Sequence, residues 1–266
     1  MWEIFQYGFM IRAFMAGLAI AITAPLIGNF LVLRRYSLIA DTLSHAALVG
    51  VAIGFLTHTS PLITTVITTV VISLCIEYLR STEKLPSEAI LGMFLPAGLA
   101  ISIVLVALSG GLNSNLLSYL FGSIATVSRF DLLLIISLAL FTVLTVIYFF
   151  PKLLFTSFDE ESARVAGVPV RKINFILIII TALCISLAIR IVGVLLIGAL
   201  MVIPVLTSLS IARSFKENVM FSVLFAVLAV ICGLVISYYA NLPAGGVIVI
   251  VSLIFFIFGL VFKNIR

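Results

Sequence analysis

Long uninterrupted apolar runs, each of about twenty residues, constrain this chain more than any other feature. A bilayer-spanning helix needs a run of this length, whereas the strands of a membrane barrel alternate apolar and polar side chains. Only 9% of the residues are charged and 64% are hydrophobic, unlike a soluble domain. We therefore expect an all-α, polytopic membrane helix bundle, a single transmembrane domain over residues 1–266. About nine spans are expected, at 11–33, 38–56, 61–79, 88–108, 130–150, 173–190, 191–212, 218–239 and 245–262.

Two segments leave the number of spans open. Residues 113–128 are apolar but too short to cross a bilayer, which favours a re-entrant or interfacial helix. At Arg190 two apolar segments meet with almost no polar residues between them. If 173–212 were one long kinked element, the number of spans would fall and the topology would change.

Basic residues orient the bundle. With the N-terminus outside and nine alternating spans, the basic residues outside the cytoplasm are Arg12, Arg129 and Arg190. The other twelve of the fifteen then lie in cytoplasmic connections. Cytoplasmic loops carry the excess of Lys and Arg in membrane proteins, so an N-out, C-in orientation is predicted.

Several protein classes are excluded or disfavoured by the same residues. The opening MWEIFQYGFMIRAFM lacks a basic region and a small-residue cleavage site, so the first apolar segment is expected to remain as a span. The basic residues alternate with spans instead of clustering on one face, which argues against nucleic-acid binding. Cys75, Cys184 and Cys232 lie singly in apolar segments, as packing residues do. The chain has no Gly-x-x-x-x-Gly-Lys-Ser/Thr loop, so we expect no ATP hydrolysis by this chain.

Residues 151–172 form the longest polar connection, and a short helix is encoded within it. Ser157-x-x-Glu160 matches a capping box. Gly167 followed by Pro169 is typical of a helix end. Acids that favour a helix N-terminus lie at Asp159, Glu160 and Glu161. We expect a helix of about two turns at the cytoplasmic surface, either a solvated linker or an element that docks a cytoplasmic partner.

Asp41 and His45 are the unusual pair of the apolar segments. Their spacing places both side chains on one face of a helix. An acid near the centre of a bilayer costs about 2.5–3.5 kcal/mol, so it needs a partner or a polar cavity. Three interpretations are open: a structural ion pair, a proton relay, or a site for a transition metal such as Zn, Mn or Fe.

The pair offers too few ligands for tight zinc binding, which takes four. A homodimer with this helix near its axis would bring two Asp and two His together. The other ionisable candidates are Glu77, near a cytoplasmic end, and His58, expected at the outer surface or at an entry gate.

Small and polar residues flank the pair. Ser37 and Ser44 are placed on its face, and Gly50-x-x-x-Gly54 predicts close packing against another helix, of the same chain or of a second copy. Prolines inside the apolar segments indicate kinks, or bent helices around a pathway, at Pro25, Pro96 and Pro204.

These segments resemble a known family. R-R-x-S-L-x-x-D-x-L-S-H-A-x-L-x-G-V-A-x-G at 34–54 is similar to the second-helix segment of permease subunits of ATP-binding-cassette importers for zinc, manganese and related divalent metals. Further similar segments follow in order, at Ser118–Ser123, Ile197–Pro204 and Leu242–Gly245. Glu161-Ser-Ala163-x-x-x-Gly167 resembles the Glu-Ala-Ala-x-x-x-Gly loop of such permeases, with Ser162 in place of Ala. Val205 stands where the family often has Ala, and we infer no functional change from it.

The resemblance implies a homodimeric permease in the bacterial cytoplasmic membrane, driven by a cytoplasmic ATP-binding subunit dimer and supplied by an extracytoplasmic metal-binding protein. It implies that Asp41 and His45 contact the ion in transit. It also makes the 151–172 helix a coupling helix that sits in a groove of the ATPase, through Asp159, Glu160, Glu161, Ala163 and Gly167. Asp-Thr-Leu-Ser-His and Ser-Tyr-Leu-Phe-Gly look closer to the zinc branch, so Zn(II) is the expected substrate, with Mn(II) or Fe(II) as alternatives. No covalently bound cofactor is expected.

Two other functions remain open from the residues themselves. A secondary transporter would use Asp41 and His45 for proton coupling, and a membrane scaffold would use them only for structure. They differ from an ATP-driven permease in needing no ATPase partner.

Overall fold

The computed structural model describes residues 6–82, 86–109, 114–123, 127–189 and 191–264, and within these ranges every regular element is helical. Eight of the helices are long and apolar enough to cross a membrane. The expected all-α membrane bundle is thereby confirmed. The long helices are α1 (Gly8–Leu33), α2 (Leu38–Leu56), α3 (Pro61–Ser81), α4 (Ser87–Leu108), α6 (Arg129–Phe158), α8 (Val170–Ala188), α10 (Phe215–Ala240) and α11 (Ala244–Asn264).

The shorter helices occupy the segments that the sequence left open. Helix α5 (Ser114–Phe121) forms within the short apolar stretch, and α7 (Glu160–Val165) forms within the long polar connection. Helix α9 (Ile197–Leu209) follows a single 3-10 turn, η2 (Val194–Leu196). With 13 residues, α9 is about 20 Å long, short of the roughly 30 Å hydrocarbon core.

The segment 173–212 is therefore not one long helix. The chain leaves helical geometry after Ala188, and Gly193 has a φ of +83°, which interrupts the path before η2. The ninth expected span exists as the shorter α9, whose start lies inside the bundle.

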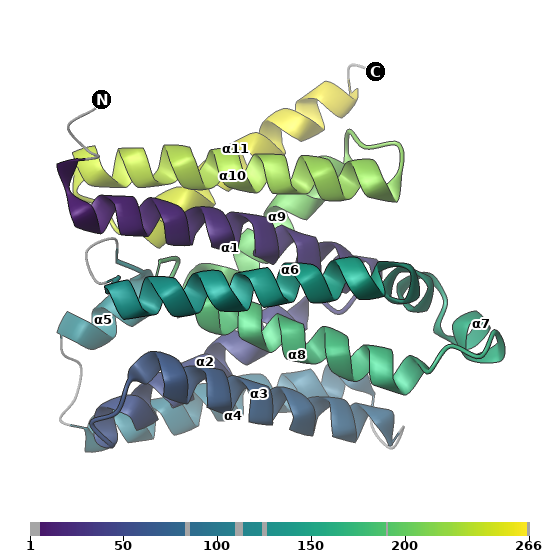
Figure 1. Cartoon of the computed structure of the whole chain (residues 1–266), viewed down its shortest axis with the longest axis horizontal. Coiled ribbons are helices and arrows are strands. Elements are labelled where there is room, and N and C mark those ends of the chain that lie inside the picture. Colours follow the sequence, from purple (N-terminus) through teal and green to yellow (C-terminus); the bar gives the residue numbers. More distant parts are fainter. Residues whose placement is uncertain (1–5, 83–85, 110–113, 124–126, 190, 265–266) are drawn as a thin grey trace.

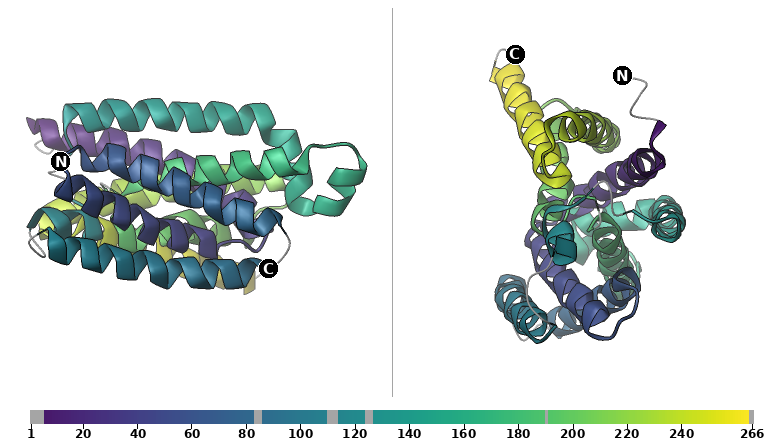
Figure 2. Two further views of the ribbon diagram at one scale, coloured as in Figure 1. Left: turned by 90° about the horizontal axis from the view of Figure 1, so that it is seen from below. Right: turned by 90° about the vertical axis from the view of Figure 1, so that its left-hand side faces the viewer.

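The long helices lie roughly side by side in three groups (Figures 1 and 2). Helix α2 packs on α3 and α4, and α10 packs on α1, α9 and α11. Helices α1, α6 and α8 lie between these groups and contact one another. The two termini lie at opposite ends of the bundle (Figure 1).

Local sequence explains where several helices begin. Pro61 occupies the first position of α3, where a missing N–H costs nothing. The hydroxyl of Ser128 accepts from the amide of Asp131, and the Asp131 side chain accepts from the amide of Ser128, which completes a capping box for α6. At 30 residues α6 is about 45 Å long, so it extends beyond the hydrocarbon core and carries α7 outside it.

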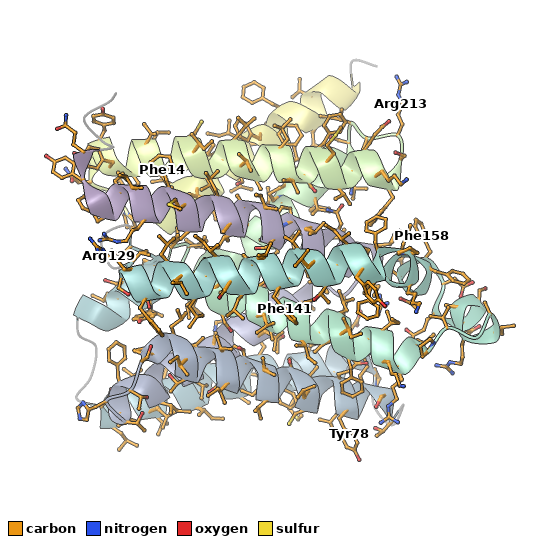
Figure 3. The ribbon with its side chains drawn as sticks, in the orientation of Figure 1. Phe14, Tyr78, Arg129, Phe141, Phe158 and Arg213 are labelled. Atoms are coloured by element: carbon orange, nitrogen blue, oxygen red, sulfur yellow. The ribbon has the colours of Figure 1, made fainter. Side chains whose placement is uncertain are left out.

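Large apolar side chains cover the outside of the bundle (Figure 3). Phe141, in the middle of α6, is 53% exposed. Tyr78 of α3, at the end of the bundle where α7 lies, is 57% exposed. Arg129 and Arg213 lie at opposite ends of the bundle in Figure 3. An apolar belt between charged ends is the surface that a lipid bilayer covers.

Candidate metal site and coupling helix

Asp41 lies in the first turn of α2, and His45 follows one turn later on the same face. Most of α2 is buried, but the Asp41 side chain is exposed on the surface of the single chain and His45 is half-buried. A carboxylate exposed on a membrane-spanning helix needs water or a partner. This placement leaves the open side of the pair to face something outside one protomer.

Glycines of two other helices, α9 and α4, lie directly against the pair. A Cβ built at Gly198, in the first turn of α9, would overlap the Oδ1 atom of Asp41. A Cβ at Gly98 of α4 would lie 3.3 Å from the backbone of His45 and Ala46. The first turn of α9 therefore forms a wall directly against the Asp41 carboxylate. Gly198 belongs to the Ile197–Pro204 segment, but its role could not be inferred without knowing that α9 meets α2.

The donor atoms of the pair fit a divalent transition metal. An imidazole nitrogen and a carboxylate oxygen are ligands that Zn, Mn and Fe accept. The Nδ1 atom of His45 is buried and has no hydrogen-bond partner among the described residues. The same residues contain no group of three or more His, Cys, Asp and Glu side chains that could hold a metal ion. One chain thus presents two ligands.

The pair lies far from the cytoplasmic end of the bundle when its position is measured along α9. Gly198 is eleven residues before Leu209, at the cytoplasmic end of α9, which corresponds to about 17 Å of helix. This is roughly half of the hydrocarbon thickness of a bilayer, about 30 Å. The position of Asp41 in the first turn of α2 is thus compatible with a site near the membrane centre.

The serines beside the pair do not extend its polar face. Ser44 is 2% exposed, and its hydroxyl donates to the carbonyl oxygen of Asp41 at 2.7 Å. Ser37 precedes α2, and its side chain makes no capping hydrogen bond. The structure thus places Ser44 in the packing and leaves Asp41 and His45 as the candidate metal-ligating side chains of this helix.

Gly50 and Gly54 pack inside the protomer. A Cβ at Gly50 would lie 2.5 Å from the Cα of Thr65, and one at Gly54 would lie 2.6 Å from the Cα of Pro61. Both neighbours belong to α3, so the predicted close packing is confirmed and its partner is the next helix of the same chain. His58 follows α2, with an exposed side chain and a φ of +53°.

Helix α9 is fixed at its cytoplasmic end by buried polar side chains. Ser208 donates to Asn218 of α10, and Asn218 donates to Asn29 of α1, both at 2.5 Å. Asn29 in turn donates to Ser222 at 2.8 Å. Pro204 lies within α9 and is buried, so it leaves one helical carbonyl without its intrahelical donor.

The opposite end of α9 is held by three glycines from distant segments, here called the glycine cluster (Gly122, Gly193 and Gly245). A Cβ at Gly122 would overlap the carbonyl oxygen of Ile191, and one at Gly245 would overlap that of Val192. Backbones therefore meet where the α5 end, the 191–193 segment and the start of α11 converge. This contact accounts for two of the segments that carry the family resemblance, 118–123 and 242–245.

Helix α7 is capped by Asp159 instead of Ser157. The Asp159 carboxylate accepts from the amide of Ser162 at 3.0 Å and also from its hydroxyl. These hydrogen bonds hold the pKa of Asp159 below its usual value. The predicted Ser157–Glu160 capping box is wrong because α6 continues to Phe158 and buries Leu153 on the way.

The end of α7 has the predicted glycine. The amide of Val168 donates to the carbonyl of Ala163 at 3.0 Å, and the amide of Gly167 donates to that of Arg164 at 3.1 Å. This pair of backbone hydrogen bonds needs a residue in the left-handed conformation, and Gly167 has a φ of +80°. Ala163 is fully buried against the bundle, while Glu161 is exposed. A short helix with one face packed and one face free is thus confirmed.

Arg34, in the turn between α1 and α2, binds side chains of α6 and α8 close to α7. Its guanidinium donates to Ser157 at 2.9 Å, to Thr156 at 2.7 Å and to Asn174 at 2.5 Å. Burial lowers the pKa of Arg34 to about 10, and the nearby Glu160 opposes that shift. Arg34 therefore remains charged at neutral pH. The sequence identifies it only as one of the basic residues that orient the bundle.

Comparison with known proteins agrees with this architecture. The family model of the ABC 3 transport family matches residues 6–263. The high-affinity zinc uptake system membrane protein ZnuB of Haemophilus influenzae is 34% identical over 98% of this chain and 100% of its own length. The manganese import system permease protein ScaB of Streptococcus parasanguinis is 31% identical over 95% of this chain and 90% of its own.

A solved structure has the same fold. PsaBC from Streptococcus pneumoniae in complex with Fab aligns with a TM-score of 0.86 and 30% sequence identity, covering 97% of this chain and 92% of that one. This chain belongs to the ABC 3 transport family.

Proposed function

We propose that this chain is the permease subunit of an ATP-driven importer that moves Zn(II) across the bacterial cytoplasmic membrane by alternating access. Family membership and the eight candidate spans support a permease. The observation that carries the metal is the Asp41–His45 pair, an exposed carboxylate beside an imidazole with an unpartnered buried nitrogen.

A second copy of the chain completes the site. Each protomer presents two ligands, and zinc takes four in a closed tetrahedral site. Two copies related by a two-fold axis beside α2 would supply two carboxylates and two imidazoles. Such an interface would also cover the carboxylate that is exposed on the single chain.

Zinc is proposed over manganese because of the ligand set. Imidazole suits zinc, whereas manganese favours carboxylate, carbonyl and water oxygens. The zinc-system relative ZnuB also aligns over its whole length at slightly higher identity than the manganese-system relative ScaB. Mn(II) or Fe(II) as the substrate would leave the permease function itself unchanged.

The energy is proposed to come from a partner ATPase that docks on α7. The chain carries no phosphate-binding loop of its own. Val165 of α7 is an apolar side chain that is 90% exposed, and Phe158, the last residue of α6, is 63% exposed. Exposed apolar groups on a capped helix outside the membrane layer support a docked element over a solvated linker. An extracytoplasmic metal-binding protein would deliver the ion at the opposite end.

In the proposed cycle, the ion enters from the outside and is held by Asp41 and His45 of both copies. ATP binding brings the ATPase subunits together and displaces α7. The bundle then exchanges outward for inward access, and the ion leaves from an incomplete coordination shell. Because the ligands belong to helices that also form the protomer core, a change in helix packing can open the site without breaking covalent structure.

Reconstitution tests this function. The permease, its ATPase and its binding protein are placed in liposomes, and uptake of Zn(II) and release of phosphate are measured together. We expect zinc-stimulated ATP hydrolysis and uptake that Asp41→Ala combined with His45→Ala abolishes. Zinc accumulation by the purified permease alone, driven by an ion gradient, would show a secondary transporter instead. Unchanged uptake in the double variant would show that the pair is structural.

A further inference from the structure

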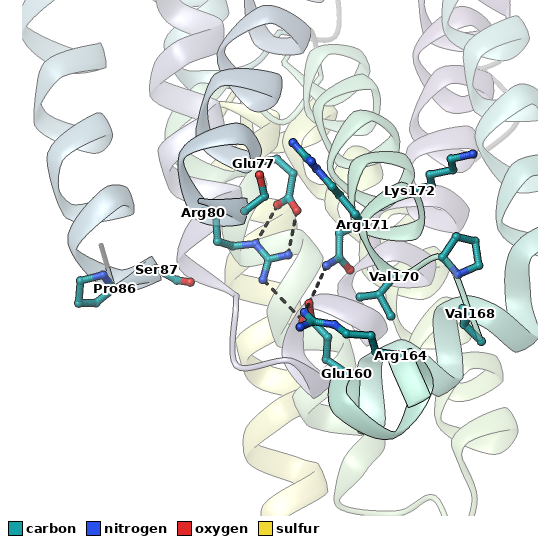
Figure 4. Close-up of a pocket in the computed structure, with 13 residues that line it drawn as sticks. Glu77, Arg80, Pro86, Ser87, Glu160, Arg164, Val168, Val170, Arg171 and Lys172 are labelled. Carbon is teal, nitrogen blue, oxygen red and sulfur yellow. Dashed lines mark hydrogen bonds and ion pairs between the residues drawn. The ribbon is translucent and has the colours of Figure 1, made fainter. Parts of the chain in front are cut away.

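The contact between α7 and α3 is a charged bridge across a cavity. Helix α7 packs on α6 and α8, and a cavity of about 820 Å³ lies between it and the ends of α3 and α4. Arg80 of α3 reaches Glu160 of α7 at this cavity, with Nη1 and Oε2 3.7 Å apart (Figure 4). The bridge therefore links two helices that are otherwise separated by water-accessible space.

Arg80 holds a second carboxylate at the same time. Its Nε and Nη2 atoms donate to the two carboxylate oxygens of Glu77 at 2.9 and 2.8 Å. Glu77 is 1% exposed, whereas Glu160 is 36% exposed. Breaking a buried ion pair leaves an uncompensated buried charge, but an exposed carboxylate can be released to water at little cost. When α7 moves, Arg80 therefore stays with Glu77 and parts from Glu160.

Arg80 also touches the turn that leads into the metal-binding helix. Its guanidinium carbon lies 5.9 Å from the centre of the Tyr36 ring, a cation–π distance. Tyr36 lies in the turn between α1 and α2, five residues before Asp41. A second route runs from Glu160 to the same turn, because Asn174 donates to Glu160 at 3.1 Å and accepts from Arg34 at 2.5 Å.

We propose that Arg80 and Glu160 form a releasable link between α7 and the start of α2. When α7 moves, the link changes the position of the start of α2, and with it the position of Asp41 against Gly198. Glu160 is the shared carboxylate, and Arg80 and Asn174 are its two connections to the residues before Asp41. Arg80 and Glu160 are positioning residues that do not touch the ion. The inference rests on the proposed function, since it assigns the link a role in coupling ATP hydrolysis to zinc movement.

The experiment measures zinc ions taken up per ATP hydrolysed in the reconstituted complex of permease, ATPase and binding protein. Glu160→Gln removes the charge but keeps an oxygen that accepts from Asn174. Arg80→Lys keeps the charge, but its single ammonium cannot serve both carboxylates as the guanidinium fork does. We expect both variants to assemble with the ATPase and to lower the ratio by about fivefold, the upper end for a partly exposed ion pair.

Lys172→Gln is the matched control. Lys172 lines the same cavity, and no carboxylate lies within 4.0 Å of it among the described residues. Its loss changes the charge of the cavity by one unit, as Glu160→Gln does but with the opposite sign, and should leave the ratio unchanged.

Three results would overturn the link: an unchanged ratio in Glu160→Gln, an equal loss in Lys172→Gln, or failure of Glu160→Gln to bind the ATPase, which would make Glu160 a docking residue. Failure of the proposed function is distinct, because the wild-type complex would then show no ATP-dependent uptake.

Discussion

At the scale of single residues, the contact between Gly198 and Asp41 sets how the carboxylate is presented. We expect Gly198→Ala to lower ATP-driven zinc uptake sharply, because the added Cβ would overlap Oδ1 of Asp41 and push either the carboxylate or α9 aside. Positioned sites lose about a hundredfold in activity for a displacement of an ångström, so a loss of at least about tenfold is expected. Uptake in proteoliposomes measures it.

Gly92→Ala provides the control for this substitution. Gly92 also lies inside a helix, α4, but a Cβ there would meet no atom within 4 Å. Alanine is favoured over glycine in a helix interior by about 1 kcal/mol, so this variant should fold and transport as wild type. Equal uptake in the two alanine variants would mean that Asp41 is not held against α9.

The residues of the site differ in how far the sequence could predict them. Asp41 and His45 are identifiable because their charge is costly in an apolar run and their spacing is local. The contacts of Gly198 with α2 and of Arg80 with α7 join helices that are distant along the chain, so no spacing indicates them. The sequence singles out Glu77 as an ionisable residue, and its (i,i+3) spacing permits an ion pair with Arg80, but the bidentate geometry of that pair depends on the side chains at the helix end.

At the scale of elements, the cap of α7 should respond to pH. Hydrogen bonds from Ser162 lower the pKa of Asp159 in the folded protein, so the cap contributes stability above the unfolded pKa of about 3.9. That contribution is lost as the pH falls through the lower folded pKa. Hydrogen exchange at the Ser162 amide, corrected for its intrinsic pH dependence, should show constant protection from pH 7 to about 5 and a loss below pH 4.

Asp159→Asn separates the cap from other acid effects. Asparagine caps helices about as well as aspartate but does not titrate in this range. We expect the variant to keep protection at neutral pH and to show no acid step at this amide. An acid step of the same size in both proteins would assign the effect to another group.

The packing of the glycine cluster, which holds the start of α9, gives a second prediction at this scale. Gly245→Ala should lower the melting temperature by several degrees, because its Cβ would overlap the carbonyl oxygen of Val192. Overpacking of this kind costs about 1–3 kcal/mol or more. The neighbouring Gly246→Ala meets no atom within 4 Å and is the control. Thermal unfolding in detergent compares the two, and equal melting temperatures would contradict the tight packing of the three segments.

The elements were predictable where hydrophobicity alone determines them. The continuous apolar runs predict about nine spans, of which eight form helices long enough to cross a membrane, and the Gly167 stop predicts the end of α7. The start of α7 was predicted wrongly because Ser157-x-x-Glu160 satisfies a local pattern, whereas Ser157 bonds Arg34 from another helix. The start of α9 could not be predicted either, because a glycine contact with other backbones, and not local propensity, ends the preceding helix.

At the scale of the whole molecule, the proposed function makes one chain a scaffold for half of a metal site. The bundle fixes α2 through α3 and α4, fixes α9 at both ends, and leaves the Asp41 carboxylate on an outer face. Composition and positive residues predict the bundle and its orientation, because they depend on the bilayer and not on specific contacts. They cannot show which face is left open, since that depends on how the helices pack against one another.

The stoichiometry of zinc binding tests whether two chains complete the site. If Asp41 and His45 of two copies hold one ion, the permease should bind one Zn(II) per two chains, a ratio that a site complete within one chain would double. Equilibrium binding to the detergent-solubilised permease, with metal quantified by mass spectrometry, measures this ratio. In complexes that pair one wild-type chain with one Asp41→Ala, His45→Ala chain, only two ligands remain, so affinity should fall by orders of magnitude instead of by half. Binding at half the wild-type capacity with unchanged affinity would instead show that each chain forms a complete site.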